Sequence, residues 1–379
     1  MLDTTVTPEM EAALQADLEY VSDTEPGIRR QGRGRGFFYT ASDGKTVRDG
    51  TTLDRIRMLA IPPAWTDVWI SINPNGHVQA TGRDARGRKQ YRYHNRWAEA
   101  RGQTKYDRLV DVAHMLPALR AQIENDLARP SPSKARVLAT VVHLLESTLI
   151  RIGNREYAAT NDSYGLTTLR DEHVQVTGTR LLFEFRGKSG KTWQLGIKDR
   201  RIARTVRLCQ ELPGQHLFQY VEAGERYAIT STEVNAYLRE ATRHDISAKD
   251  IRTWAGTVLA ATTLAQADPP QNASHAKKII TAAIKQVAAR LGNTPAVARK
   301  AYVHPEVLEA YLDGQLPAAF ILPKRKNDWL RPDERAVLSI LELRSSSVSG
   351  QPSRSRKVGR KKVGGDRARR ALVGRRADR

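Results

Sequence analysis

The sequence predicts an α+β protein with a small N-terminal β-sheet domain with helices, followed by a mainly α-helical domain that contains a small β-hairpin sheet. Short aromatic and apolar runs separated by turn residues dominate residues 36–80, and helical periodicity begins after about residue 106. The C-terminus is rich in Lys and Arg and lacks an apolar pattern. We therefore expect a first domain at 1–105, a second at 106–345 and a disordered basic tail at 346–379.

In the first domain, turn dipeptides separate the runs that predict strands. The expected strands cover 36–39, 68–72 and 77–80. Asp43-Gly44 and Asn75-Gly76 are typical hairpin turns. A helix is expected near 53–59, and the alternating glycines and arginines of 29–36 predict a flexible loop.

The second domain combines helices with one basic hairpin. The apolar positions 109, 112, 116 and 119 mark one expected helix. Another starts near 200, and the others cover 136–150, 231–243, 248–267 and 275–291. The segment 136–150 is apolar on almost every side, so it should lie at the centre of the domain. Two alternating runs, 181–185 and 192–195, predict a hairpin whose tip, 186–191, is basic.

The charge of the chain indicates a polyanionic partner. The 379 residues carry a formal net charge of +21 and a pI near 10.2, which favours nucleic acid. The single cysteine, Cys209, excludes an intramolecular disulfide and a Cys-rich zinc site. No signal peptide or membrane span is apparent, so we expect a cytoplasmic protein.

A tyrosine near residue 300 is the first candidate for chemistry. Thr294 followed by Pro295 is a typical helix start, and Pro305 disfavours helix at the residue before it. Tyr302 should thus lie in the last turn of a short helix, beside Arg299 and Lys300. Neighbouring cations favour the ionised phenol that a nucleophile requires.

Four motifs in this order resemble the type IB DNA topoisomerases, most closely the small poxvirus-like bacterial branch. They are Arg151 in Ile-Arg-Ile-Gly, Lys188 in Gly-Lys at the hairpin tip, Arg252 in Lys-Asp-Ile-Arg-Thr-Trp, and Tyr302 in Lys-Ala-Tyr. The resemblance covers roughly residues 25–330 and implies the catalytic fold that type IB topoisomerases share with tyrosine recombinases.

The resemblance implies a role for each of these side chains. Tyr302 would attack a DNA phosphodiester and form a 3′-phosphotyrosyl intermediate, while Arg151 and Arg252 stabilise the transition state. Lys188 would protonate the leaving 5′ oxygen, although Lys191 stands nearby as a second candidate. Asn293 takes the place of the histidine of most relatives and can donate a hydrogen bond to phosphate, but it cannot act as an acid.

Further residues are expected to contact double-stranded DNA. The segment 83–97 mixes six basic residues with three aromatic ones. The residues that the resemblance assigns to DNA contact are Arg88, Lys89, Gln90, Tyr91, Tyr93, Gly153 and Tyr157. The two domains would then close around the duplex as a clamp, with the protein acting as a monomer.

Two alternatives remain open at this point. A tyrosine recombinase would use the same chemistry, but recombinases usually carry a histidine where this chain has Lys249, and their N-terminal domain is typically helical. A nonenzymatic DNA-binding protein would also explain the charge. No nucleotide-binding loop or carboxylate cluster is apparent, so we expect no ATP, metal or other cofactor.

Overall fold

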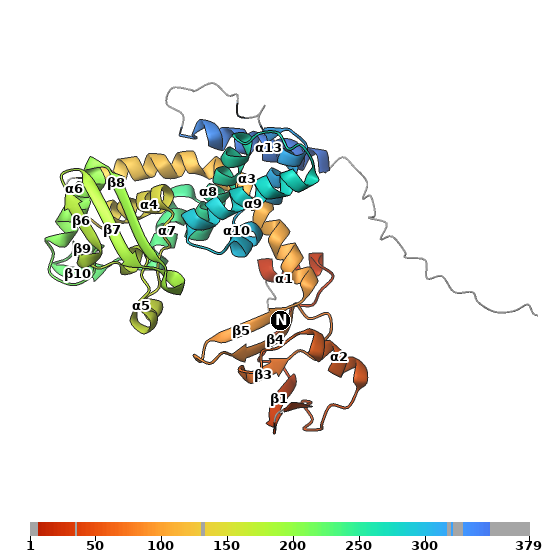
Figure 1. The fold of residues 1–379 in the computed structure, drawn as a ribbon. Helices are drawn as coiled ribbons and strands as arrows, with labels where there is room; N and C mark the ends of the chain where they lie inside the picture. Colours follow the sequence, from red (N-terminus) through yellow and green to blue (C-terminus); the bar gives the residue numbers. More distant parts are fainter. Residues whose placement is uncertain (1–6, 35, 130–132, 317–319, 321–328, 349–379) are drawn as a thin grey trace, which may run out of the picture.

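The computed structural model describes residues 7–34, 36–129, 133–316, 320 and 329–348. A small sheet domain lies below a larger, mainly helical body, and the long helix α3 (Asn95–Leu127) connects the two (Figure 1). None of the helices in these ranges is both long and apolar enough to cross a bilayer. The disordered tail expected from residue 346 starts too early, because residues 346–348 still belong to the helix α13 (Pro332–Val348); the rest of the predicted tail lies outside the described residues.

The small domain is built on a five-stranded antiparallel sheet with the order β2-β1-β3-β4-β5. Its strands are β1 (Ile28–Arg33), β2 (Gly36–Thr40), β3 (Thr66–Ile70), β4 (Val78–Arg83) and β5 (Lys89–Tyr93). The helix α2 (Gly50–Met58) packs Ile56 against Val68 and Ile70 in a small buried core. The expected strands and the helix near 53–59 are thus confirmed.

The flexible loop expected at 29–36 is wrong, because most of this segment forms β1 and the start of β2. The strand β1 pairs with both β2 and β3. Arg30 lies 4.2 Å from the centroid of the Phe37 ring and donates to the Trp65 carbonyl at 2.5 Å. The methylene groups of arginine side chains cover apolar surface here, where strands usually use apolar residues. The sequence therefore lacks the alternating apolar pattern that predicts a strand.

The helical body surrounds α4 (Lys134–Thr148), which is buried along most of its length. Its other helices are α5 (Arg155–Asn161), α6 (Arg200–Gln210), α7 (Ser231–Thr242), α8 (Ala248–Ala265), α9 (Ala273–Leu291), α10 (Pro295–Ala301), α11 (Pro305–Leu312) and α13 (Pro332–Val348). The helices α3, α7 and α8 all pack against α4. The central position predicted for 136–150 is therefore confirmed.

Two small sheets flank the helices. A three-stranded antiparallel sheet contains β6 (Val174–Thr177), β7 (Arg180–Arg186) and β8 (Thr192–Lys198), and the last two form the predicted basic hairpin. A second hairpin, β9 (Gln219–Glu222) with β10 (Glu225–Ala228), was not predicted. Its strands have only four residues each, too few for a clear alternating pattern.

The helix α3 runs through the boundary expected at residue 105. Near its start, Trp97 packs with Ala12, Ala13 and Leu18, and Ala12 and Ala13 belong to α1 (Pro8–Gln15). Farther along, α3 contacts α4, α7, α8 and α13. One continuous helix therefore joins the sheet domain to the body, and the division into two domains stays an interpretation.

Candidate active site

Tyr302 lies directly after α10, where the chain turns toward α11. Thr294 caps α10 and its hydroxyl accepts a hydrogen bond from the Val297 amide at 3.3 Å, as the Thr-Pro motif predicts. Tyr302 is the C-terminal cap, with φ −139° and ψ 0°, one residue beyond the last turn in which we expected it. The side chain is 7% exposed, so the phenol is held by its surroundings.

Close packing against α8 holds Tyr302 in place. A Cβ atom on Gly256 would lie 2.6 Å from the Tyr302 carbonyl oxygen, so only glycine permits this approach. The Thr257 hydroxyl donates to the same carbonyl at 3.4 Å. One turn earlier on α8 stands Arg252, whose guanidinium carbon lies 5.7 Å from the centroid of the Tyr302 ring.

Arg252 is buried and joins the ends of two helices. It donates hydrogen bonds to the Leu149 carbonyl, at the C-terminus of α4, and at 2.8 Å to the Leu291 carbonyl, at the C-terminus of α9. Helix C-termini carry partial negative charge, which stabilises a buried cation. Its Nε atom is buried without a hydrogen-bond partner among the described residues.

Arg151 follows the end of α4 and is fixed by its backbone. Its carbonyl accepts from the Leu166 amide at 2.8 Å, and a Cβ on Gly165 would lie 2.5 Å from that oxygen. Gly153 has φ +100°, a conformation that favours glycine, so a backbone requirement accounts for this residue. The Arg151 side chain donates to Oδ1 of Asn293, which brings these two predicted residues together.

The two arginines determine the ionisation of Tyr302. Burial is the largest single influence and opposes ionisation, but the charges of Arg252 and Arg151, with hydrogen bonds to both, outweigh it and lower the pKa of Tyr302 below its usual value of 10.0. The sequence neighbours Arg299 and Lys300, to which we ascribed this effect, are exposed and are not among the main influences on the pKa of Tyr302. The activating cations come from elsewhere in the chain.

The hairpin lysines differ in their contacts. Lys191 donates to the Asn293 backbone carbonyl at 3.0 Å, so this lysine reaches the site. Lys188 opens the turn at the tip and is exposed. The assignment of Lys188 as the acid stays a prediction, and Lys191 remains its competitor.

The predicted DNA-contact residues of the small domain lie on and beside β5. Tyr91 and Tyr93 are exposed and stacked, with ring centroids 5.7 Å apart and an interplanar angle of 9°. Arg88 and Gln90 both donate to the Asp84 carboxylate, at 2.8 and 3.0 Å. Lys89, also on β5, pairs with Asp23 at 2.6 Å. Tyr157, predicted to contact DNA as well, lies on α5 in the helical body, and its side chain lies outside the described residues.

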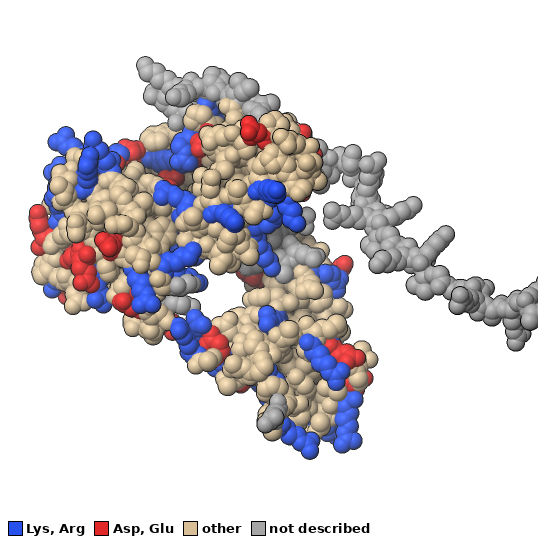
Figure 2. Space-filling view, viewed as in Figure 1, with Lys and Arg blue, Asp and Glu red and all other residues tan. Residues whose placement is uncertain are grey.

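An open passage separates the sheet domain from the helical body (Figure 2). Lys and Arg side chains gather around its rim in this view, as a channel for a polyanion requires. On one side the two parts meet, because Arg86, in the turn between β4 and β5, donates to Asn161 at the end of α5. No sequence pattern predicted this contact, which joins residues 75 positions apart.

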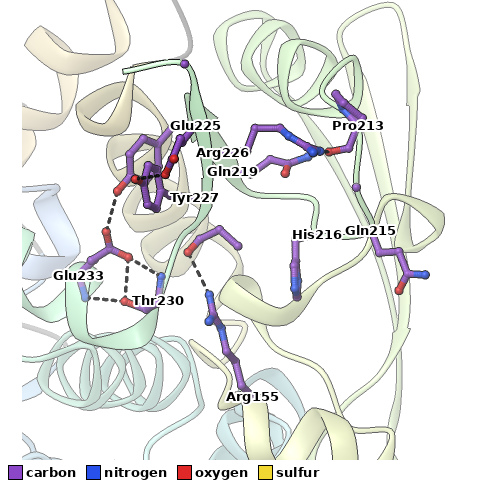
Figure 3. Close-up of a pocket in the computed structure, with 14 residues that line it drawn as sticks. Arg155, Pro213, Gln215, His216, Gln219, Glu225, Arg226, Tyr227, Thr230 and Glu233 are labelled. Carbon is purple, nitrogen blue, oxygen red and sulfur yellow. Dashed lines mark hydrogen bonds between the residues drawn. The ribbon is translucent and has the colours of Figure 1, made fainter. Parts of the chain in front are cut away.

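A polar hollow of about 910 Å³ lies between α5, α7 and the β9–β10 hairpin (Figure 3). Arg155, at the start of α5, extends along it and donates to the Ala228 carbonyl at 3.1 Å. Neither Tyr302 nor Arg252 lines this hollow. The hollow contains the contact that ties α5 to the end of β10.

Comparisons with known proteins identify the family of this chain. Residues 94–317 match the family described as eukaryotic DNA topoisomerase I, catalytic core, and residues 36–84 match the bacterial DNA topoisomerase IB N-terminal domain. The chain is 32% identical over 310 residues to DNA topoisomerase 1B of Acanthamoeba polyphaga mimivirus, which covers 80% of this chain and 91% of the viral one. It is 24% identical over 299 residues to DNA topoisomerase 1B of vaccinia virus (strain Copenhagen), covering 74% and 90%. The chain therefore belongs to the type IB DNA topoisomerase family.

Proposed function

We propose that this protein relaxes supercoiled duplex DNA by cutting one strand with Tyr302, holding the end as a 3′-phosphotyrosine and resealing it without ATP. Family membership supports the activity, and the lowered pKa of Tyr302 supports its role as the nucleophile. Two arginines beside one buried phenol suit a reaction in which negative charge builds up on phosphate oxygens.

Two unpaired donors carry this proposal. Nε of Arg252 and Nδ2 of Asn293 are buried and find no acceptor among the described residues. Most buried polar groups in proteins are paired, and these two unpaired donors lie beside the same phenol, so together they suit a bound ligand. Asn293 also accepts from Arg151, and Arg252 stands beside Tyr302, so both donors belong to the nucleophile's surroundings. The nonbridging oxygens of a phosphodiester would supply the missing acceptors.

The proposed reaction balances without an external energy source. Tyr302 first loses its phenol proton to solvent, and the ionised oxygen then forms a bond to phosphorus while the bond from phosphorus to the 5′ oxygen breaks. Lys188, as the general acid, gives its proton to that oxygen, and the free 5′ hydroxyl later attacks the phosphotyrosine to reverse each step. One phosphoester replaces another, so no nucleotide is consumed.

The clamp supports duplex DNA as the substrate. The passage with its basic rim and the stacked tyrosines of β5 would contact the backbone and the bases of a duplex. We propose that a single copy of the chain encloses the DNA, since both sides of the passage come from the same chain. Rotation of the cut strand around the intact one would then release supercoils.

Replacing the Tyr302 hydroxyl tests the proposal directly. Tyr302→Phe should abolish relaxation of a negatively supercoiled plasmid and the denaturant-resistant protein–DNA adduct, while duplex affinity stays within about twofold because one hydroxyl contributes little to phosphate binding. Relaxation by the phenylalanine variant would overturn the assignment. Site-dependent strand exchange in place of multi-turn relaxation would indicate a recombinase instead.

A further inference from the structure

One tryptophan ring lies between two glycines of the site. A Cβ atom on Gly187, at the base of the hairpin tip, would lie 2.6 Å from Nε1 of Trp193. A Cβ on Gly292, the C-terminal cap of α9, would lie 2.6 Å from Cζ2 of the same ring. Side chains do not approach so closely. The five-membered ring of the indole therefore occupies the space that a side chain at Gly187 would need, and the six-membered ring occupies the space that a side chain at Gly292 would need.

The indole is supported from a third direction. Trp193 stacks on Phe185 with ring centroids 6.1 Å apart and planes 2° from parallel. Phe185 is buried in the main core, against which Trp193 also packs. Stacked aromatic pairs have a defined geometry, so the ring is a fixed body between the two backbones.

Each glycine precedes a residue of the proposed chemistry. Gly187 is followed by Lys188, and Gly292 by Asn293. The amide of Gly187 donates to the Lys191 carbonyl at 2.7 Å, which closes the turn, and Nζ of Lys191 donates to the Asn293 carbonyl at 3.0 Å. One ring thus joins the turn that carries both lysines to the loop that carries the phosphate-binding amide.

We infer that Trp193 is a positioning residue: its indole, wedged between Gly187 and Gly292, sets where the hairpin lysine meets the 5′ oxygen of the cut bond. The inference rests on the proposed function. Lys188, Gly190 and Lys191 are exposed at the tip, so the base of the turn is where its direction can be controlled. A proton donor must lie within hydrogen-bond distance of the leaving oxygen, so a small rotation of the turn removes the acid from the reaction.

A single methyl group tests the wedge. Gly187 has φ −98°, which any residue adopts, so Gly187→Ala adds only a methyl aimed at the indole. We expect single-turnover cleavage of ordinary DNA to slow by about 10- to 100-fold. DNA with a 5′-bridging sulfur at the cleaved bond should be cut within about threefold of the wild-type rate, because a thiolate has a much lower pKa than an alkoxide and leaves without an acid.

Matched variants separate positioning from general damage. Gly196→Ala, on β8, should leave both rates unchanged, because its Cβ would lie no closer than 4.0 Å to another atom. Trp193→Ala should slow ordinary DNA and spare the sulfur substrate. Trp193→Phe, with its smaller ring, should restore part of the cleavage lost in Gly187→Ala.

The outcomes distinguish this inference from the proposed function. A wild-type protein that forms no adduct through Tyr302 overturns both. The role of Trp193 alone is overturned if the wild-type protein forms the adduct but the two variants do not distinguish the substrates. In that case Trp193→Ala and Gly187→Ala slow the cleavage of both substrates equally, or slow neither. Failure of Trp193→Phe to improve Gly187→Ala contradicts a steric wedge at that glycine.

Discussion

The guanidinium of Arg252 lies beside the ring of Tyr302, 5.7 Å from its centroid, and at the same time holds the carbonyls that end α4 and α9. The cation that favours the phenolate is thus fixed by two helix ends before any DNA binds. Preorganised charge of this kind stabilises a transition state without a reorganisation cost.

Arg252→Ala is expected to slow cleavage by about 10²- to 10³-fold, the usual loss for one transition-state donor. It should also lower the melting temperature, because the carbonyls of Leu149 and Leu291 lose their partner, at a cost of about 1–3 kcal/mol for each buried unsatisfied group. Single-turnover cleavage and thermal unfolding measure the two effects. Arg299→Ala, at an exposed residue adjacent to the site in sequence, serves as the control and should change neither the cleavage rate nor the melting temperature. If this variant slows cleavage as much as Arg252→Ala does, then the residues adjacent in sequence activate Tyr302.

The pH dependence of cleavage should reflect the lowered pKa of Tyr302. With a 5′-bridging sulfur substrate, which needs no acid, the rate should rise with pH and level off below pH 10, the usual pKa of a tyrosine. Arg151→Gln removes one of the two charges that favour the phenolate, so the pKa of Tyr302 should increase and the inflection should move to higher pH. An inflection that stays in place or moves to lower pH would contradict the electrostatic role of Arg151.

Cleavage of the ordinary and the sulfur-containing DNA should distinguish the roles of the two hairpin lysines. Lys188→Ala is expected to slow cleavage of ordinary DNA by about 10²- to 10⁴-fold, the range for loss of a general acid, with recovery on the sulfur substrate. Lys191→Ala breaks the bond to the Asn293 carbonyl and should have the smaller effect. If only Lys191→Ala shows the substrate-dependent recovery, then Lys191 is the acid.

The contact between Arg86 and Asn161 should mark the place where the clamp opens. Cysteines at both positions, joined by a bifunctional thiol reagent after DNA binding, should hold the protein on a closed circular plasmid in high salt, which removes ordinary charge contacts. Linearising the plasmid should release the cross-linked protein, because the protein can then slide off the DNA ends. Each single-cysteine variant is a control, with the native Cys209 buried in α6. Equal retention on linear DNA would place the opening elsewhere.

The sequence predicted the elements well where a pattern is local. The helix around 136–150, the hairpin 181–195 and the capped start at Thr294 all follow from periodicity and capping, and the structure confirms them. The sequence did not predict β1, where arginines replace apolar residues, or β9 and β10, which are too short to show an alternating period.

The sequence by itself determined which residue types are available: a tyrosine after a short helix, two arginines, an asparagine, a lysine hairpin and a strong positive charge. Only the tertiary structure decided that Arg252 and Arg151 are the main cations that lower the pKa of Tyr302, and that Lys191 reaches Asn293. The physical reason is distance. Electrostatic and hydrogen-bond energies depend on separation in space, and packing of α4, α8 and α9 brings together groups that lie up to 151 positions apart in the chain, as Arg151 and Tyr302 do.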